Sequence, residues 1–416
     1  MITVIRSDLL IDGTNGKAIE NPVVLVEGSK IVGIYQGEAP EGAIPSDARV
    51  LDYAGCTLLP GLIDAHIHSN LPGDGTSFEE SVREDDGVLV ATSANNVRIA
   101  LESGVTTVRD TGGRGSSTFS VRRTLDLGYG EGSRMLLVGQ PMTITGGHTW
   151  YFGGEADGVD GVRRKVRELC KLGADWIKVI NSGGGTLNTK SYLPSFNRDE
   201  LNAIADETHR MGRRVTVHTL NADALDDAIT AGVDGIEHAS FLVDSSQSQQ
   251  YSPRVAEKLA ESGIPVTTTL VVAYDAVTAM NAKEKLTPTE QAFLDSWSGM
   301  MEANVAQFGQ LREAGVRFMA GTDAGWRFTT VRSLPDEMWL MTQGGMTGEE
   351  AIYSTTGQSA DILGISDITG RVKVGLEADL IAVTGDPRGD VRGLRKTRLV
   401  MQGGQVKVAD AADSAA

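Results

Sequence analysis

Cysteine and long apolar runs are what this sequence has least of. Only Cys56 and Cys170 occur in 416 residues, which is too few for a disulfide framework and favours a reducing compartment. No stretch reaches the roughly 20 apolar residues that a membrane-spanning helix needs, and charge appears too early at the N-terminus for a signal peptide. We therefore expect a soluble, cytoplasmic protein without a membrane partner.

Basic residues are also in short supply. Lys and Arg total 38 against 55 Asp and Glu, so the formal net charge is −17. Nucleic acids and anionic membranes need basic patches on their partners, and we therefore expect neither as a partner. The hydrophobic fraction of 40% is typical of a globular protein. The length exceeds what one core needs and predicts a large and a smaller domain.

Both ends of the chain have the pattern of short strands separated by turn residues. Apolar runs at 3–5, 23–26 and 30–35 near the N-terminus match runs at 378–383, 399–401 and 405–408 near the C-terminus. We therefore expect residues 1–56 and 366–410 to form one small β-sandwich domain from both termini. Residues 411–416 lack an apolar pattern and are expected to be a disordered tail.

The middle of the chain, residues 57–365, alternates short apolar runs with amphipathic segments such as 198–211 and 253–262. Eight such runs lie at 57–68, 106–110, 135–139, 176–180, 215–218, 235–238, 265–270 and 316–323. Eight strands alternating with helices are typical of a (β/α)8 TIM barrel in the α/β class. The competing fold, a doubly wound open sheet, usually has a Gly-rich phosphate loop after its first strand, and none follows His68.

Histidine is scarce, with six in the chain, yet four of the six stand at the ends of predicted strands. His66 and His68 end the first strand, where alternate residues share a face and two imidazoles would aim at one point. His218 and His238 end the fifth and sixth strands, and Asp323 ends the eighth. Because the C-terminal strand ends of a barrel converge, these residues form a candidate site for divalent metal.

Lys178, in the fourth predicted strand, fits this set less simply. A charged lysine would be repelled by divalent cations and costly to bury, so it could instead reach solvent or pair with an acid. Alternatively, burial beside metals lowers its pKa, and the neutral amine reacts with carbon dioxide to give a carbamate, a carboxylate-like bridging ligand. The five other candidate ligands favour the carbamate.

These residues resemble the amidohydrolase superfamily, specifically its binuclear members with a carboxylated lysine. The resemblance rests on PGLIDAHIH at 60–68, IEH at 236–238, GTDAG at 321–325 and GLEADL at 375–380. It implies that His66, His68 and Asp323 bind the more buried metal. His218 and His238 would bind the more exposed metal, with N6-carboxylated Lys178 bridging the two.

The same resemblance implies a hydrolytic mechanism. Two divalent ions share a hydroxide that attacks the scissile carbonyl; we expect zinc, although manganese, cobalt or iron suit such ligands. Asp323 would act as general acid/base, passing the proton to the leaving group, or it could serve as a ligand alone.

The sequence also offers candidate substrate contacts. His148 lies in a Gly-Gly-His segment after the third strand. This segment resembles the branch of imidazolonepropionase-like and Xaa-Pro dipeptidase-like proteins. The resemblance implies that His148 contacts a substrate carbonyl or carboxylate, and the alternative is a surface-loop residue. Tyr151 is a further candidate. Dipeptidase-like relatives commonly carry a tyrosine where this chain has Leu220, which weakens a dipeptidase assignment and predicts a more apolar pocket. Further residues that could line the pocket or be structural are Arg109, Asp110, Trp326 and Arg327.

The leading prediction is a binuclear metal-dependent hydrolase that cleaves a C–N bond in a small-molecule amide, N-acyl amino acid, carbamate or urea, and that forms a homo-oligomer. One alternative is an Xaa-Pro-type dipeptidase or carboxypeptidase. Another is a mononuclear imidazolone-type hydrolase or deaminase, although the glutamate that such relatives often carry soon after the strand-five histidine is missing from residues 219–222. A non-catalytic scaffold is disfavoured because all six candidate ligands are present.

Overall fold

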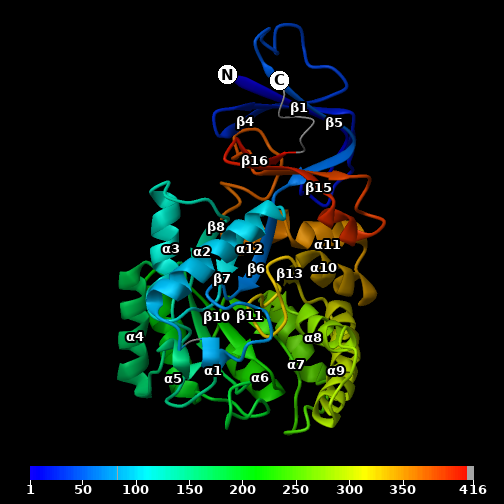
Figure 1. Cartoon of the computed structure of the whole chain (residues 1–416). Coiled ribbons are helices and arrows are strands. Elements are labelled where there is room, and N and C mark those ends of the chain that lie inside the picture. The colour runs from blue at the N-terminus through cyan, green and yellow to red at the C-terminus, as the bar shows by residue number, and fades with distance from the viewer. Residues whose placement is uncertain (82, 410–416) are drawn as a thin grey trace.

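The computed structural model describes residues 1–81 and 83–409. Figure 1 shows two parts: a sheet built from both ends of the chain lies above a larger part in which strands are surrounded by helices. The tail predicted to be disordered, residues 411–416, lies outside the described residues. No helix in the described part of the chain is long and apolar enough to cross a membrane.

The upper part is one eight-stranded sheet with the order β16-β15-β14-β5-β1-β3-β4 and β2 on β1. Its strands are β1 (Ile2–Leu10), β2 (Ile19–Glu20), β3 (Pro22–Glu27), β4 (Lys30–Gln36), β5 (Arg49–Pro60), β14 (Leu380–Thr384), β15 (Thr397–Gln402) and β16 (Gln405–Ala409). β5 pairs in parallel with β1 and antiparallel with β14, so the two chain ends share one ladder. Gly403 and Gly404, with φ of 53° and 75°, form the tight turn between β15 and β16, where both central residues need positive φ.

The apolar run at 57–63, expected to belong to one strand, is divided between the two parts. Its first residues, Thr57 to Pro60, end β5 and pair with β14. The next strand, β6 (Leu62–Ile67), begins after Gly61, whose N–H donates to the Asp379 carbonyl at 2.8 Å. Both strands are buried there, so hydrophobicity alone could not locate the break.

The lower part contains the eight parallel strands expected from the sequence, which confirms the α/β class. β6, β7 (Val105–Asp110) and β8 (Arg134–Leu137) form one sheet. The second sheet comprises β9 (Trp176–Ile180), β10 (Arg214–Thr219), β11 (Gly235–His238), β12 (Val266–Thr268) and β13 (Phe318–Ala320), each parallel to the next. Single parallel bridges, Met142 to Val179 and Ile67 to Ala324, join the two sheets at both edges.

Helices connect and surround these strands (Figure 1). They are α1 (Phe78–Ser81), α2 (Asp86–Glu102), α3 (Ser117–Asp126), α4 (Gly158–Leu172), α5 (Arg198–Arg210), α6 (Ala222–Thr230), α7 (Pro253–Ser262), α8 (Val271–Asn281), α9 (Pro288–Glu313), α10 (Leu334–Gln343), α11 (Gly348–Ser354) and α12 (Gly357–Leu363), with short 3₁₀ turns η1 (Trp150–Phe152) and η2 (Val391–Arg395). α5 and α7 match the predicted amphipathic segments. α5 begins at a capping box in which Asn197 and Glu200 satisfy each other's backbone N–H groups.

The core that positions the site lies between the parallel strands and these helices. α4 shows how the sequence builds it: Val162, Val166 and Leu169 recur at helical spacing and are fully buried. Each such side chain contributes about 1.5–3 kcal/mol by leaving water. The strands are thereby held in fixed register, and their C-terminal ends face a common pocket.

Candidate metal centre

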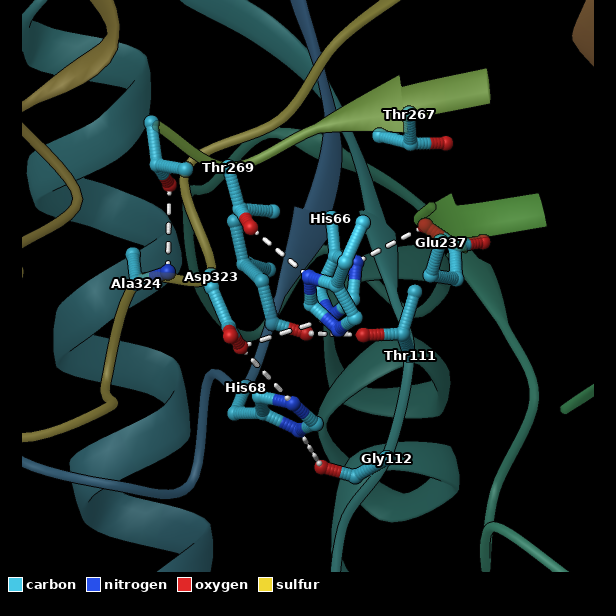
Figure 2. Close-up of polar contacts among 12 residues, drawn as sticks. His66, His68, Thr111, Gly112, Glu237, Thr267, Thr269, Asp323 and Ala324 are labelled. Atoms are coloured by element: carbon cyan, nitrogen blue, oxygen red, sulfur yellow. Dashed lines mark hydrogen bonds and ion pairs between the residues drawn. The ribbon is translucent and has the colours of Figure 1, made fainter. Parts of the chain in front are cut away.

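His66 in β6 and His68, the first residue after it, place two imidazoles on one side of the chain, as the alternation of a strand predicts. Their Nε2 atoms lie 3.3 and 3.1 Å from the same oxygen, Asp323 Oδ1 (Figure 2). Asp323 follows β13 and is 9% exposed. The first and eighth predicted strands therefore bring their polar ends together.

His238 and His218 complete the cluster from β11 and β10. The ring centroids of His218 and His238 are 4.7 Å apart, and those of His66 and His238 are 5.2 Å apart. Ligand atoms of His66, His238 and Asp323 all lie within 4.8 Å of one another. His238 and Asp323 have φ of 69° and 57°, a left-handed conformation that is uncommon outside glycine and concentrates at functional sites.

Each of the four histidines has one ring nitrogen tied to a group outside the cluster. The Nδ1 atoms of His66, His68 and His238 lie 2.8, 2.8 and 2.7 Å from Glu237 Oε2, the Gly112 carbonyl and Thr269 Oγ1. For His218 the tied atom is Nε2, which lies 3.3 Å from the Gly183 carbonyl. The opposite nitrogen of each ring is thus left for the centre, the arrangement that orients metal-binding histidines.

Lys178 reaches the same cluster from within β9, as its third residue and not at its end. Its side chain is 2% exposed, and burial lowers its pKa to about 8, although the charges of Glu237 and Asp323 oppose that shift. No hydrogen bond to its amino group is found among the described residues. A buried amine of this kind is costly to keep charged.

Burial favours the neutral imidazole of His218 and His238, which is the form that binds metal. Burial, followed by the nearby His66, lowers the pKa of His238 to about 3, and burial together with neighbouring imidazoles holds the pKa of His218 well below its usual value. Asp323 and His68 shift each other's pKa in opposite directions. Although burial opposes both shifts, their contact raises the pKa of His68, and with His66 it holds the pKa of Asp323 well below its usual range.

Beneath the cluster lies an ion pair that the sequence did not predict. Arg109 Nη2 donates to Glu237 Oε1 at 2.6 Å, and both side chains are fully buried. Arg109 also donates to the Ala65 carbonyl and Thr267 Oγ1. Arg109 was a candidate for the pocket, and the structure instead places it in the interior, where it supports Glu237 and through it His66.

The cluster lines a pocket together with both polar and apolar side chains. The polar ones include Ser191, Ser240, Gln247, Gln249, Thr269 and Asn304. Leu220, Leu242, Val272, Trp297, Met300 and Trp326 line the pocket as well, together with Phe152 and Arg327. Arg327 stacks over the Trp297 ring, with 5.5 Å between the guanidinium carbon and the ring centroid. Leu220, a candidate substrate contact, is among the residues that line the pocket.

The other residues that the sequence offered as substrate contacts or pocket residues lie partly in the pocket lining and partly outside it. His148 is buried and lines the pocket, 5.2 Å between ring centroids from His218. Tyr151 lies outside this lining and packs with Leu71 and Phe152. Asp110 is fully buried and accepts a hydrogen bond from the Ser69 N–H, a structural role. His209 of α5 lies outside the pocket lining and pairs with Asp234 at 2.8 Å, with its side chain 43% exposed.

The loop after β9 is folded against the pocket. The Gly183 N–H donates to the Lys190 carbonyl at 3.1 Å. A Cβ on Gly184 would lie 2.4 Å from His148 Nε2, and one on Gly185 would lie 2.6 Å from the Trp326 ring. Glycine is therefore required here so that the two rings can pack against the backbone.

The chain is similar over most of its length to known proteins. The family model described as "Amidohydrolase family" matches residues 57–407. Ochratoxinase of Aspergillus niger is 27% identical, over 96% of this chain and 84% of its own, and imidazolonepropionase of Streptomyces griseus is 24% identical, over 89% and 87%. Among solved structures, that of a Xaa-Pro dipeptidase with bound methionine superposes with a TM-score of 0.84 at 25% identity, covering 98% of this chain and 100% of the other.

These relatives confirm the branch predicted from the sequence and a hydrolytic activity directed at C–N bonds. The chain belongs to the amidohydrolase family.

Proposed function

We propose that this protein is a binuclear metal-dependent hydrolase in which carboxylated Lys178 bridges two divalent ions. His66, His68 and Asp323 would hold the buried ion, and His218 and His238 the exposed one. The fold that carries them is a (β/α)8 barrel, supported by the consecutive parallel strands and by the single bridges at both edges between the two sheets.

The observation that carries the proposal is the orientation of the four histidines. Each ring has one nitrogen hydrogen-bonded to a fixed partner, so the remaining nitrogen of each is available for a metal. A buried lysine without a hydrogen-bond partner among the described residues stands beside them. A carbamate on Lys178 would turn that unmatched amine into a carboxylate ligand.

When bound, the two ions would supply a water that is nucleophilic at neutral pH and would polarise the scissile carbonyl. The chain itself contributes the proton transfer. Asp323 faces the centre with Oδ1 and is ionised at neutral pH, so it can accept a proton from the attacking water and return it to the leaving nitrogen.

The pocket wall indicates a substrate with a bulky apolar or aryl group beside the scissile bond. Leu220, Trp297, Met300 and Trp326 form an apolar part of the pocket lining. Amides, N-acyl amino acids, carbamates and ureas with such groups fit this chemistry. An Xaa-Pro dipeptidase activity is the second candidate, favoured by the superposition on a protein of that name, but Leu220 occupies the position where dipeptidase-like relatives commonly have tyrosine.

Metal analysis tests the proposal. After reconstitution with zinc and bicarbonate we expect two ions per chain, and His218→Ala and Lys178→Ala should bind fewer. The matched surface variants His209→Ala and Lys171→Ala should bind as many as the unaltered protein. One ion per chain would instead support the mononuclear alternative.

Activity measurements provide a second test of the proposed function. A screen of N-acyl amino acids, Xaa-Pro dipeptides, aryl amides, aryl carbamates and phenylureas identifies the substrate class. On the best compound, Lys178→Ala should lose most activity and recover part of it with a short carboxylic acid such as propionate. Unchanged rates in Lys178→Ala would show that no carbamate takes part.

A further inference from the structure

His148 has one ring nitrogen held from behind. Its Nδ1 lies 2.7 Å from Thr186 Oγ1, and the same oxygen accepts a hydrogen bond from the Thr149 backbone N–H at 3.1 Å. Both side chains are buried, with His148 5% and Thr186 4% exposed. We propose that Thr186 is a positioning residue that fixes His148 as the Nε2–H tautomer, so that His148 donates a hydrogen bond to an oxygen of the bound substrate.

The tautomer follows from counting donors and acceptors at Thr186. A hydroxyl has one hydrogen to donate and two lone pairs to accept with. The Thr149 N–H can only donate, so it uses one lone pair of Thr186 Oγ1. Among the described residues, the only acceptor within reach of the Thr186 hydroxyl hydrogen is then His148 Nδ1. Nδ1 must therefore be unprotonated, and the neutral ring carries its proton on Nε2.

The opposite tautomer leaves a group unsatisfied. If Nδ1 carried the proton, it would donate to the second lone pair of Thr186 Oγ1, and the hydroxyl hydrogen would have no acceptor in the described part of the chain. A buried donor without an acceptor is strongly disfavoured. The hydrogen bond from Thr149 thus determines which way the Thr186 hydroxyl points, and Thr186 determines where the proton of His148 resides.

The surroundings of His148 Nε2 suit it to donate a hydrogen bond to the substrate. His148 lines the pocket next to His218, and no hydrogen bond to Nε2 is found among the described residues. Its ring lies on Gly184 and meets the Trp326 ring edge-on, with centroids 5.8 Å apart. An N–H held there by three neighbours is preorganised for an oxygen acceptor, either a carbonyl that gains charge in the reaction or a carboxylate.

The choice of tautomer does not depend on the proposed hydrolysis, whereas the substrate contact rests on it. The two are therefore tested separately. For the tautomer, the zinc-loaded full chain is labelled with [15N]histidine and long-range ¹H–¹⁵N spectra are recorded, with His148→Asn used to assign the His148 signals. The unaltered protein should show a protonated Nε2 and an unprotonated Nδ1.

Thr186→Val keeps the shape of the side chain and removes the hydroxyl, so His148 should lose its fixed tautomer. Thr186→Ser should restore it, and the control Thr149→Val, which keeps its backbone N–H, should leave it unchanged. Thr186→Ala replaces the valine variant if that variant does not fold. An unprotonated Nε2 in the unaltered protein, or the same tautomer in Thr186→Val, would overturn the proposal.

The catalytic consequence is measured on the most active compound of the screen. With the metal content unchanged, Thr186→Val should lower kcat/KM about tenfold, as expected for one lost hydrogen bond in the transition state. Thr186→Ser should retain most of the activity. Equal kcat/KM in Thr186→Val would overturn the substrate contact, and a chain that hydrolyses none of the compounds would refute the proposed function while leaving the spectra decisive for the tautomer.

Discussion

The buried pair Arg109–Glu237 allows a quantitative test of what supports the metal centre. Replacing Arg109 with Met removes the guanidinium but roughly preserves its apolar stem, so Glu237 is left buried with no cation at Oε1, where Arg109 now lies at 2.6 Å. Removing one partner of a buried pair costs about 3–5 kcal/mol. Because domains are stable by only about 5–15 kcal/mol, this one substitution removes a large share of the stability.

The double variant tests the reasoning more sharply. Glu237→Gln alone leaves the Arg109 charge buried without its partner. Arg109→Met combined with Glu237→Gln leaves neither charge buried. The double variant should therefore be more stable than the sum of the two single losses predicts. The measurement is the denaturant-unfolding free energy of metal-free protein, because bound metal would add its own stabilisation.

The exposed pair Arg98–Glu102, with side chains 45% and 39% exposed, provides the control. Arg98→Met should change stability by no more than about 1 kcal/mol. If the losses of the two buried single variants simply added in the double variant, the ion pair would not be the reason for the destabilisation.

Two further predictions concern the pocket and the core. Gly184→Ala would place its Cβ 2.4 Å from His148 Nε2 and should displace that ring, so kcat/KM should fall while metal analysis shows an unchanged metal content; Gly299→Ala, with open space around its Cβ, is the control and should leave activity unchanged. Burial raises the pKa of Glu337 to about 8 from an ordinary value of 4.5. Between these pH values the folded chain holds a proton that the unfolded chain releases, so this residue makes stability fall as pH rises, by at most about 1.4 kcal/mol per pH unit. Glu337→Gln should flatten that fall in unfolding free energies measured from pH 5 to 8, and an unchanged slope would contradict the raised pKa.

The sequence predicted those parts of the fold and site that depend on local periodicity. The eight parallel strands were each visible as apolar runs, and the alternation along β6 predicted that His66 and His68 share a face. Lys178 was conspicuous because a lysine in a buried strand needs a reason. All three inferences use information contained within a few residues.

What the sequence did not reveal depends on contacts between distant segments. Thr269, Thr186 and the Gly112 carbonyl orient His238, His148 and His68 from loops whose paths no periodic pattern describes. Arg109 meets Glu237 across the interior of the strands, a pairing over 128 positions of sequence. The predicted cytoplasmic location and homo-oligomer rest on the sequence alone and stay predictions.

The sheet built from both chain ends has a consequence for synthesis on the ribosome. β5 leads directly into β6, yet its second neighbour, β14, is made only after every strand of the α/β part. Because synthesis adds about 5–20 residues per second, one edge of β5 stays unpaired for tens of seconds. Until β14 emerges, that edge is open to pairing with another chain, so chaperone demand during translation should be highest for the segment that ends at Pro60.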